Sequence, residues 1–232
     1  MASPPARLFG LFALDHLQFE HDRSADAEPS LAMMTASAIR MLAQDPDGYF
    51  LMIEGGRIDH AHHLGNASRA LEDTVAMAEA VAAAAALTDA RETLILVTAD
   101  HSHTLTISGY PKRGNPILGL TGDTDAAGRA FTTLGYANGP GATGASDSQP
   151  AGPKTFPHQP KSYSPDPTAR PDLSEIDTAD PNYLQEALVP GDMETHGGED
   201  VAVYARGPGS PAVHGVIEQN EIYHIMRAAL GW

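Results

Sequence analysis

Apolar residues recur along the first half of the chain with the period of an α-helix. A spacing of three to four residues predicts two helices, over residues 29–44 and 66–87. In the first of them Leu31, Met34 and Ala38 fall on one face. Both stretches are long enough to pack one apolar face against a core.

Short continuous apolar runs predict strands that are buried on both faces. Such runs cover residues 49–53, 93–98 and 201–205, and helical spacing returns over 219–230. Strand, helix and strand in succession predict a parallel βαβ unit. The expected fold class is therefore α/β, with a mostly parallel sheet sandwiched by helices. Since no run of about 18 apolar residues is present, no transmembrane segment is predicted.

The middle of the chain has a different composition. From residue 109 to residue 191 glycine and proline are dense and apolar periodicity fades, which is typical of loops and short strands. The sequence therefore predicts an α/β core over residues 1–108, a loop-rich insertion over 109–192, and a return to the core over 193–232.

The net charge argues against one class of function, and the absence of cysteine excludes two kinds of structural site. With 14 basic and 30 acidic residues the formal net charge is −16, and no lysine or arginine cluster offsets it, so nucleic-acid binding is not expected. The chain has no cysteine, which excludes disulfides and thiolate zinc sites. Its first residues lack the basic-then-apolar pattern of a signal peptide.

Three short polar stretches hold six of the 11 histidines. They cover residues 54–63, 99–103 and 194–200. The first two directly follow predicted strands, and ligands of parallel α/β sheets gather at the carboxyl ends of strands. We therefore expect Glu54 and Asp100 at the same edge of one sheet.

The residue types in these stretches predict a metal centre. Asp59 and His63 are four residues apart and share one face of a helical turn. Asp100 and His101 are adjacent at a strand exit, and His196 lies in the third stretch. Carboxylate and imidazole without thiolate suit zinc, manganese, cobalt or magnesium. Paired metals of this kind serve in-line displacement at phosphorus.

Other polar residues have simpler interpretations. Arg57 is a candidate phosphate clamp, but a structural or solvent-facing role is favoured. Ser102 lies between two histidines, yet nothing places it at a helix N-terminus, so a nucleophilic role is not favoured. The remaining histidines have no converging partners in the sequence and are interpreted as surface or structural residues: His16, His21, His158, His214 and His224.

The sequence segments EGGRIDHAHH, VTADHSH and THGGEDVAVYARGP resemble segments of the alkaline phosphatase family. They occur in the same order and at compatible spacing. The resemblance extends from about residue 8 to residue 226. It implies a phosphomonoester hydrolase that uses two zinc ions and one magnesium ion and forms a phosphoserine intermediate. It also implies small phosphomonoester substrates, a homodimer, and a periplasmic or extracellular location.

The resemblance assigns roles to individual residues. Asp59, His63 and His196 match the ligands of the first zinc. Asp100 and His101 match two ligands of the second zinc.

Two further roles and one region follow from the same resemblance. Glu54 matches a carboxylate of the magnesium site. His103 resembles a residue outside the ligand set that orients a metal-bound aspartate. The loop-rich insertion resembles the crown region, which shapes the entrance and contributes to dimer contacts in the family.

Several family features have no match in the chain. The Asp-Ser-Ala word with the nucleophilic serine, the aspartate that bridges two metals and the phosphate-binding arginine all lie upstream in the family. The resemblance therefore predicts the C-terminal, metal-binding half of such an enzyme. Two alternatives stay open, a catalytically inactive zinc-binding fragment and a related metallo-phosphodiesterase or sulfatase.

Overall fold

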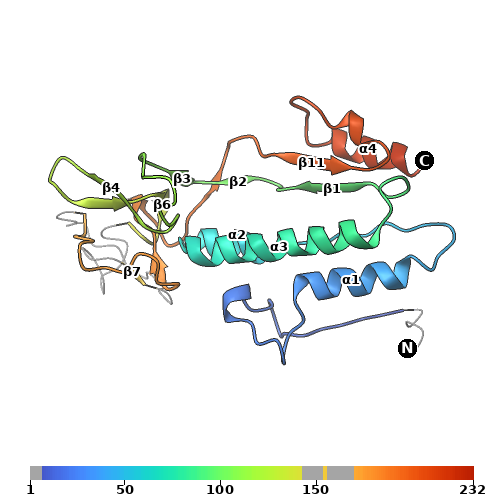
Figure 1. Cartoon of the computed structure of the whole chain (residues 1–232), viewed down its shortest axis with the longest axis horizontal. Helices are drawn as coiled ribbons and strands as arrows, with labels where there is room; N and C mark the ends of the chain where they lie inside the picture. The colour runs from blue at the N-terminus through green and yellow to red at the C-terminus, as the bar shows by residue number, and fades with distance from the viewer. Residues whose placement is uncertain (1–6, 143–153, 156–169) are drawn as a thin grey trace.

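The computed structural model describes residues 7–142, 154–155 and 170–232. Figure 1 shows α1, α3, the β1–β11 pair and α4 stacked in that order, with β3, β4, β6 and β7 gathered beyond one end of α3. The short sheets and the helices together make a fold of the mixed α/β type. No helix in these ranges is long and apolar enough to cross a bilayer.

The first predicted helix is confirmed as α1 (Leu31–Leu42). It begins after Ser30, whose side chain accepts a hydrogen bond from the Met33 N–H and so caps the first turn. Thr35 and Ile39 are buried on the face that packs against α3. The helix is shorter than predicted because turn residues begin soon after its last apolar position.

The second predicted helix is confirmed as α3 (Ala67–Leu87), with Asn66 as its N-cap. Its buried face is mostly alanine, including Ala70, Ala76 and Ala80. Small side chains let the neighbouring helices approach closely. The short helix α2 (Arg57–His63) directly precedes α3 and packs against it.

Two predicted strands are confirmed, but they pair in a different way from the one expected. β1 (Ile95–Thr98) and β11 (Val203–Arg206) form an antiparallel pair. The run over residues 49–53 is not a strand, so the predicted parallel βαβ unit is not formed within the described part of the chain. A cavity of about 730 Å³, lined by this run on one side and β1 on the other, separates the two segments. Without a neighbour at hydrogen-bonding distance the run cannot form a ladder.

A small antiparallel pair and three further elements complete the core. β2 (Ser102–His103) pairs with β10 (His196–Gly197). The closing helix predicted over 219–230 is confirmed as α4 (Glu221–Ala229). Two single-turn 3-10 helices, η1 (Glu20–Asp22) and η2 (Ser210–Ala212), lie in the connections.

Short strands occupy the described part of the predicted insertion and its borders. β6 lies between β3 and β9, antiparallel to the first and parallel to the second, while β4 pairs with β5 and β7 with β8. Their bounds are β3 (Leu105–Ile107), β4 (Leu120–Thr124), β5 (Ala130–Thr132), β6 (Leu134–Gly139), β7 (Lys154–Thr155), β8 (Tyr183–Leu184) and β9 (Ala187–Pro190). The division of the chain into core and insertion stays a prediction, and His158 lies outside the described residues.

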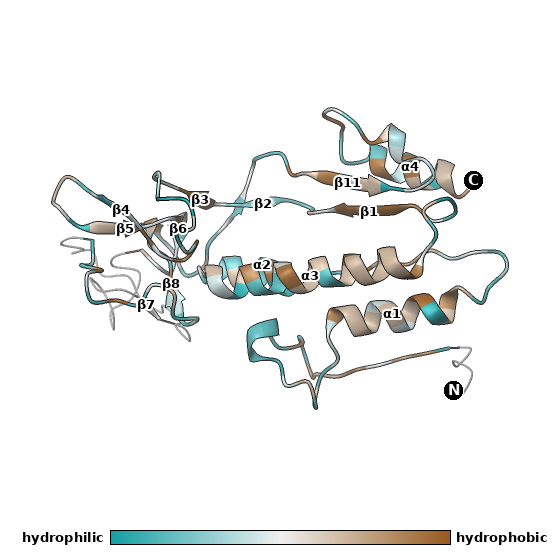
Figure 2. Ribbon diagram, viewed as in Figure 1, coloured by the Kyte–Doolittle hydropathy of each residue, from teal (hydrophilic) through white to brown (hydrophobic). Residues whose placement is uncertain are grey.

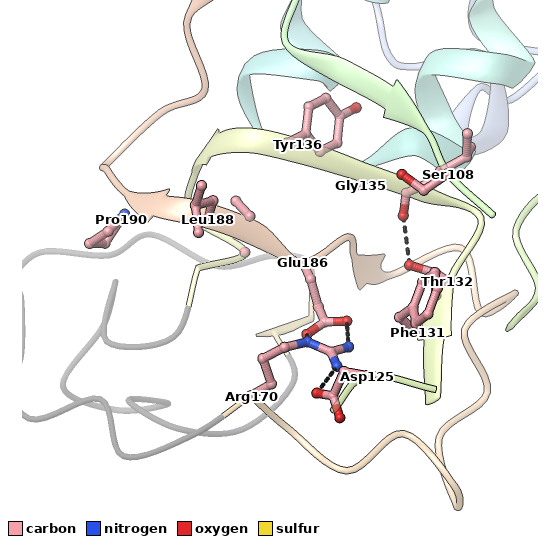
Figure 3. Close-up of a pocket in the computed structure, with 13 residues that line it drawn as sticks. Ser108, Asp125, Phe131, Thr132, Gly135, Tyr136, Arg170, Glu186, Leu188 and Pro190 are labelled. Atoms are coloured by element: carbon pink, nitrogen blue, oxygen red, sulfur yellow. Dashed lines mark hydrogen bonds and ion pairs between the residues drawn. The ribbon is translucent and has the colours of Figure 1, made fainter. Parts of the chain in front are cut away.

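An arginine joins two parts of this region (Figure 3). The Arg170 guanidinium donates to both carboxylate oxygens of Glu186, at 2.9 and 2.6 Å, and to Asp125 at 2.6 Å. These acceptors hold the pKa of Arg170 above its usual range. The group borders a cavity of about 610 Å³. Since two carboxylates neutralise the cation, Arg170 serves the structure here and is not a free anion-binding group.

Candidate metal centre

Four imidazole rings surround the carboxylate of Asp59. Its Oδ1 atom lies 3.1 Å from Nε2 of His103, 3.3 Å from Nε2 of His63 and 3.4 Å from Nε2 of His196. Nε2 of His101 is slightly farther, at 3.8 Å. All three polar stretches therefore contribute to one cluster.

Local geometry and strand pairing together build the cluster. Helix α2 places Asp59 and His63 one turn apart on one face, as predicted. The β2–β10 pairing sets His196 directly opposite His103. The two backbones approach closely because Gly197 has no side chain, and a Cβ there would lie 2.7 Å from the His103 carbonyl oxygen.

Three of the rings are oriented by hydrogen bonds at Nδ1. His63 donates to the Glu194 carbonyl oxygen at 2.6 Å, and His103 donates to Oε2 of Glu194 at 2.7 Å. His101 donates to the Ser102 carbonyl oxygen at 3.1 Å. Because a carbonyl or carboxylate oxygen only accepts, each Nδ1 carries the proton. A ring whose proton is on Nδ1 can present the lone pair of Nε2 to a metal, as histidine ligands of metals do.

The distances within the cluster fit a zinc ion. Oδ1 of Asp59 and the two Nε2 atoms of His63 and His196 form a triangle with edges of 3.3, 3.4 and 3.2 Å. Ligand bonds of about 2.0–2.1 Å in a tetrahedron require edges of about 3.3–3.4 Å. Oδ1 of Asp59 and Nε2 of His103 are also buried and make no regular hydrogen bond among the described residues. A cation would satisfy these atoms, which are costly to leave alone.

Of the other predicted ligands, His101 belongs to the cluster itself, while Asp100 and Glu54 lie at its margin. Asp100 is 81% exposed, and its Oδ2 atom lies 3.5 Å from Nε2 of His101. Glu54 is exposed and belongs to neither of the two groups of converging ligand atoms in the described ranges. The structure thus brings together the set predicted for the first zinc, while the roles of Asp100, His101 and Glu54 stay predictions.

Sequence reasoning missed Glu194. Its side chain is fully buried and forms a second group of converging atoms with His63 and His103. The residue lies in the third polar stretch, but spacing alone gives no sign that a carboxylate two positions before His196 turns inward.

A second missed contact lies behind His103. The His62 ring stacks on the His103 ring at a centroid distance of 4.7 Å, and its Nδ1 atom lies 2.9 Å from the Tyr136 hydroxyl. Burial, followed by the neighbouring His103, lowers the pKa of His62 to about 4. His62 is therefore neutral at physiological pH and supports the cluster by packing.

Arg57 has the structural role that the sequence favoured. Its guanidinium stacks 3.8 Å above the centroid of the Phe19 ring, and Nη1 lies 3.1 Å from Nδ1 of His60. Burial lowers the pKa of Arg57 from its usual range. The side chain is thus engaged within the fold and does not extend toward Asp59.

Comparison with known proteins places these residues in context. The model of a protein family described as alkaline phosphatase matches residues 2–232. The tissue-nonspecific isozyme of alkaline phosphatase from Gallus gallus is 46% identical over 223 residues, which are 96% of this chain and 39% of the relative. The Homo sapiens isozyme is 42% identical over 225 residues, 96% of this chain and 38% of the relative.

A fish relative gives the same picture. An alkaline phosphatase from Gadus morhua is 41% identical over 223 residues, 96% of this chain and 42% of the relative. The chain therefore spans about two fifths of the length of the curated relatives it matches.

Proposed function

Because the chain belongs to the alkaline phosphatase family, we propose that it supplies the zinc-holding part of a phosphomonoester hydrolase. The observation that carries the proposal is the triangle of ligand atoms from Asp59, His63 and His196, whose edges match those of a tetrahedral zinc site. Three protein ligands with one open position are the pattern of a catalytic zinc.

Each residue of this site has its own proposed role. Asp59 would supply an oxygen ligand, while His63 and His196 would supply nitrogen ligands from two different elements. Zinc at such a site acts as a Lewis acid and lowers the pKa of a water molecule. Nε2 of His103 lies 3.1 Å from Oδ1 of Asp59, so this ring lies directly beside the carboxylate ligand.

The proposal extends to the remaining ligands. Asp100 and His101 would hold a second zinc ion, and Glu54 would contribute to a magnesium site. Support comes from family membership and from the 3.5 Å approach of the first two side chains. Small phosphomonoester substrates, a homodimer, a crown-like role of the insertion and a periplasmic or extracellular location are proposed from family membership alone.

A nucleophile is the missing part of the proposed reaction. Ser102 is the hydroxyl nearest in sequence to the ligands, but its Oγ donates to the His103 carbonyl oxygen at 3.1 Å. No base in the described ranges is hydrogen-bonded to that hydroxyl. We therefore propose that the serine of the phosphoserine intermediate comes from the part of the family's length that this chain does not span.

The first experiment measures zinc content and hydrolysis together. The purified chain is supplied with zinc and magnesium at alkaline pH and assayed with a chromogenic phosphate monoester. We expect about one tightly held zinc per chain and no turnover. His196→Ala should lose that zinc, because the site then keeps two of its three ligands. His214→Ala, which removes an exposed histidine far from the cluster in sequence, is the control and should keep it.

Two results would change the proposal. A wild-type chain that retains no zinc would refute the metal site. Turnover by the isolated chain that disappears in His196→Ala would show that the chain contains its own nucleophile.

A further inference from the structure

Glu194 is a buried carboxylate that touches the metal centre without facing it. Its side chain is 0% exposed and accepts three hydrogen bonds. The donors are Nδ1 of His103 at 2.7 Å, the Thr104 N–H at 2.5 Å and the Thr104 hydroxyl at 2.7 Å. A buried carboxylate is costly unless its lone pairs are used, and here three of them are.

The backbone of the same residue orients a second ring. The Glu194 carbonyl oxygen accepts from Nδ1 of His63 at 2.6 Å, and the Glu194 N–H donates to the His63 carbonyl oxygen at 2.9 Å. His63 belongs to α2 and His103 to β2. One residue therefore orients imidazoles from two elements that are not neighbours in sequence.

Strand β6 holds Glu194 against the centre. A Cβ on Gly139 would lie 3.0 Å from Cβ and 3.2 Å from Cα of Glu194, and Gly139 has a φ of +130° that favours glycine. Asn138 exchanges two hydrogen bonds of 2.9 Å with the backbone N–H and hydroxyl of Thr195. Contacts with Asn138 and Gly139 of β6 thus fix the loop that carries Glu194.

We propose that Glu194 is a positioning residue of the metal centre, which holds His63 and His103 with their Nε2 atoms directed at Asp59. The inference rests on the proposed function, since the rings matter because a metal binds there. A carboxylate is required because all three side-chain contacts come from donors. An amide of the same shape would turn its own N–H groups toward one of them.

Glu194→Gln tests the role with little change in volume. Residues outside the ligand set that support the ligands change metal affinity by about 10- to 100-fold when replaced. The ring affected in Glu194→Gln is His103, which lies 3.1 Å from the ligand Asp59. We expect the zinc dissociation constant, measured by competition with a chromogenic chelator, to rise within that range. Asp192→Asn removes the same charge from an exposed position two residues away and should leave the constant unchanged.

A second measurement does not depend on metal. Long-range ¹H–¹⁵N correlation spectra of the metal-free wild-type chain report which ring nitrogen carries the proton. His63 and His103 should both be Nδ1–H tautomers, and His103 should lose that preference in Glu194→Gln. An Nε2–H tautomer at His103 in the wild type would overturn the proposal, as would an unchanged zinc constant in Glu194→Gln. Should the wild type bind no zinc, the proposed function fails, while the tautomers still decide whether Glu194 orients the rings.

Discussion

At the scale of single residues, the histidines of the chain differ in what surrounds each ring. His62 is enclosed between His103 and Tyr136, so burial disfavours its charged form. His21 instead lies at the surface, 3.1 Å from Glu72.

His62 predicts a loss of stability in mild acid. Its pKa is lowered from 6.5 to about 4 in the folded chain. The unfolded chain therefore binds more protons between these values, and the free energy of unfolding falls as pH falls from about 6.5 toward 4. The full effect is about 3 kcal/mol. Urea unfolding of the metal-free chain at several pH values measures it.

The matched variant is His62→Gln, which keeps a hydrogen-bonding group and removes the titration. Its unfolding free energy should depend less steeply on pH over this window. A slope equal to that of the wild type would assign the acid sensitivity to other groups.

At the scale of elements, hydrogen bonds at the start of α3 join this helix to the segments that contain Asp22 and Pro181. Asn66 caps the helix through Oδ1, at 2.8 Å from the Arg69 N–H, while its Nδ2 donates to the Pro181 carbonyl oxygen at 2.8 Å. The Arg69 guanidinium makes two hydrogen bonds of 2.8 Å to Asp22 and one of 2.6 Å to the same Pro181 oxygen. These contacts fix the start of α3, which directly follows α2, the helix that carries Asp59.

Asn66→Ala should destabilise the chain by about 2 kcal/mol, because it removes a cap and leaves a buried carbonyl with one donor fewer. Ser30→Ala at the start of α1 is the matched control, since the Ser30 side chain makes the cap bond and no other hydrogen bond among the described residues. We expect about 1 kcal/mol for the control. Urea unfolding compares them, and equal losses would show that the tie to Pro181 contributes nothing.

At the scale of the whole molecule, apolar surface is left open beside β1. Figure 2 colours β1 and much of β11 as hydrophobic. Across the cavity from β1, Phe50 is 59% and Met52 70% exposed. Exposed apolar surface next to a free strand edge favours association.

The isolated chain should therefore self-associate at micromolar concentrations. Met52→Glu places a charge on the open face and should shift the chain toward monomer in sedimentation velocity. Val216→Glu, at a position that is 88% exposed in the loop before α4, adds the same charge elsewhere and should not. A wild-type chain that is already monomeric would contradict the expectation.

Local spacing made much of this protein predictable from the sequence. Helices α1, α3 and α4 follow from periodicity and capping residues, and β1 and β11 from apolar runs. The shared face of Asp59 and His63 depends on a spacing of four within one helical turn. The sequence segments that resemble the family added His196, because no rule of local spacing connects it to Asp59 and His63.

The sequence by itself thus determined the helices α1, α3 and α4, the strands β1 and β11, and which residue types could bind a metal. Only the tertiary structure decided that β1 pairs antiparallel with β11, that residues 49–53 stay without a partner, and that Glu194 turns inward to His103. The physical reason is distance along the chain. Glu194 and His103 are 91 residues apart, and their contact depends on how β2, β10 and β6 meet, which periodicity within any one segment does not encode.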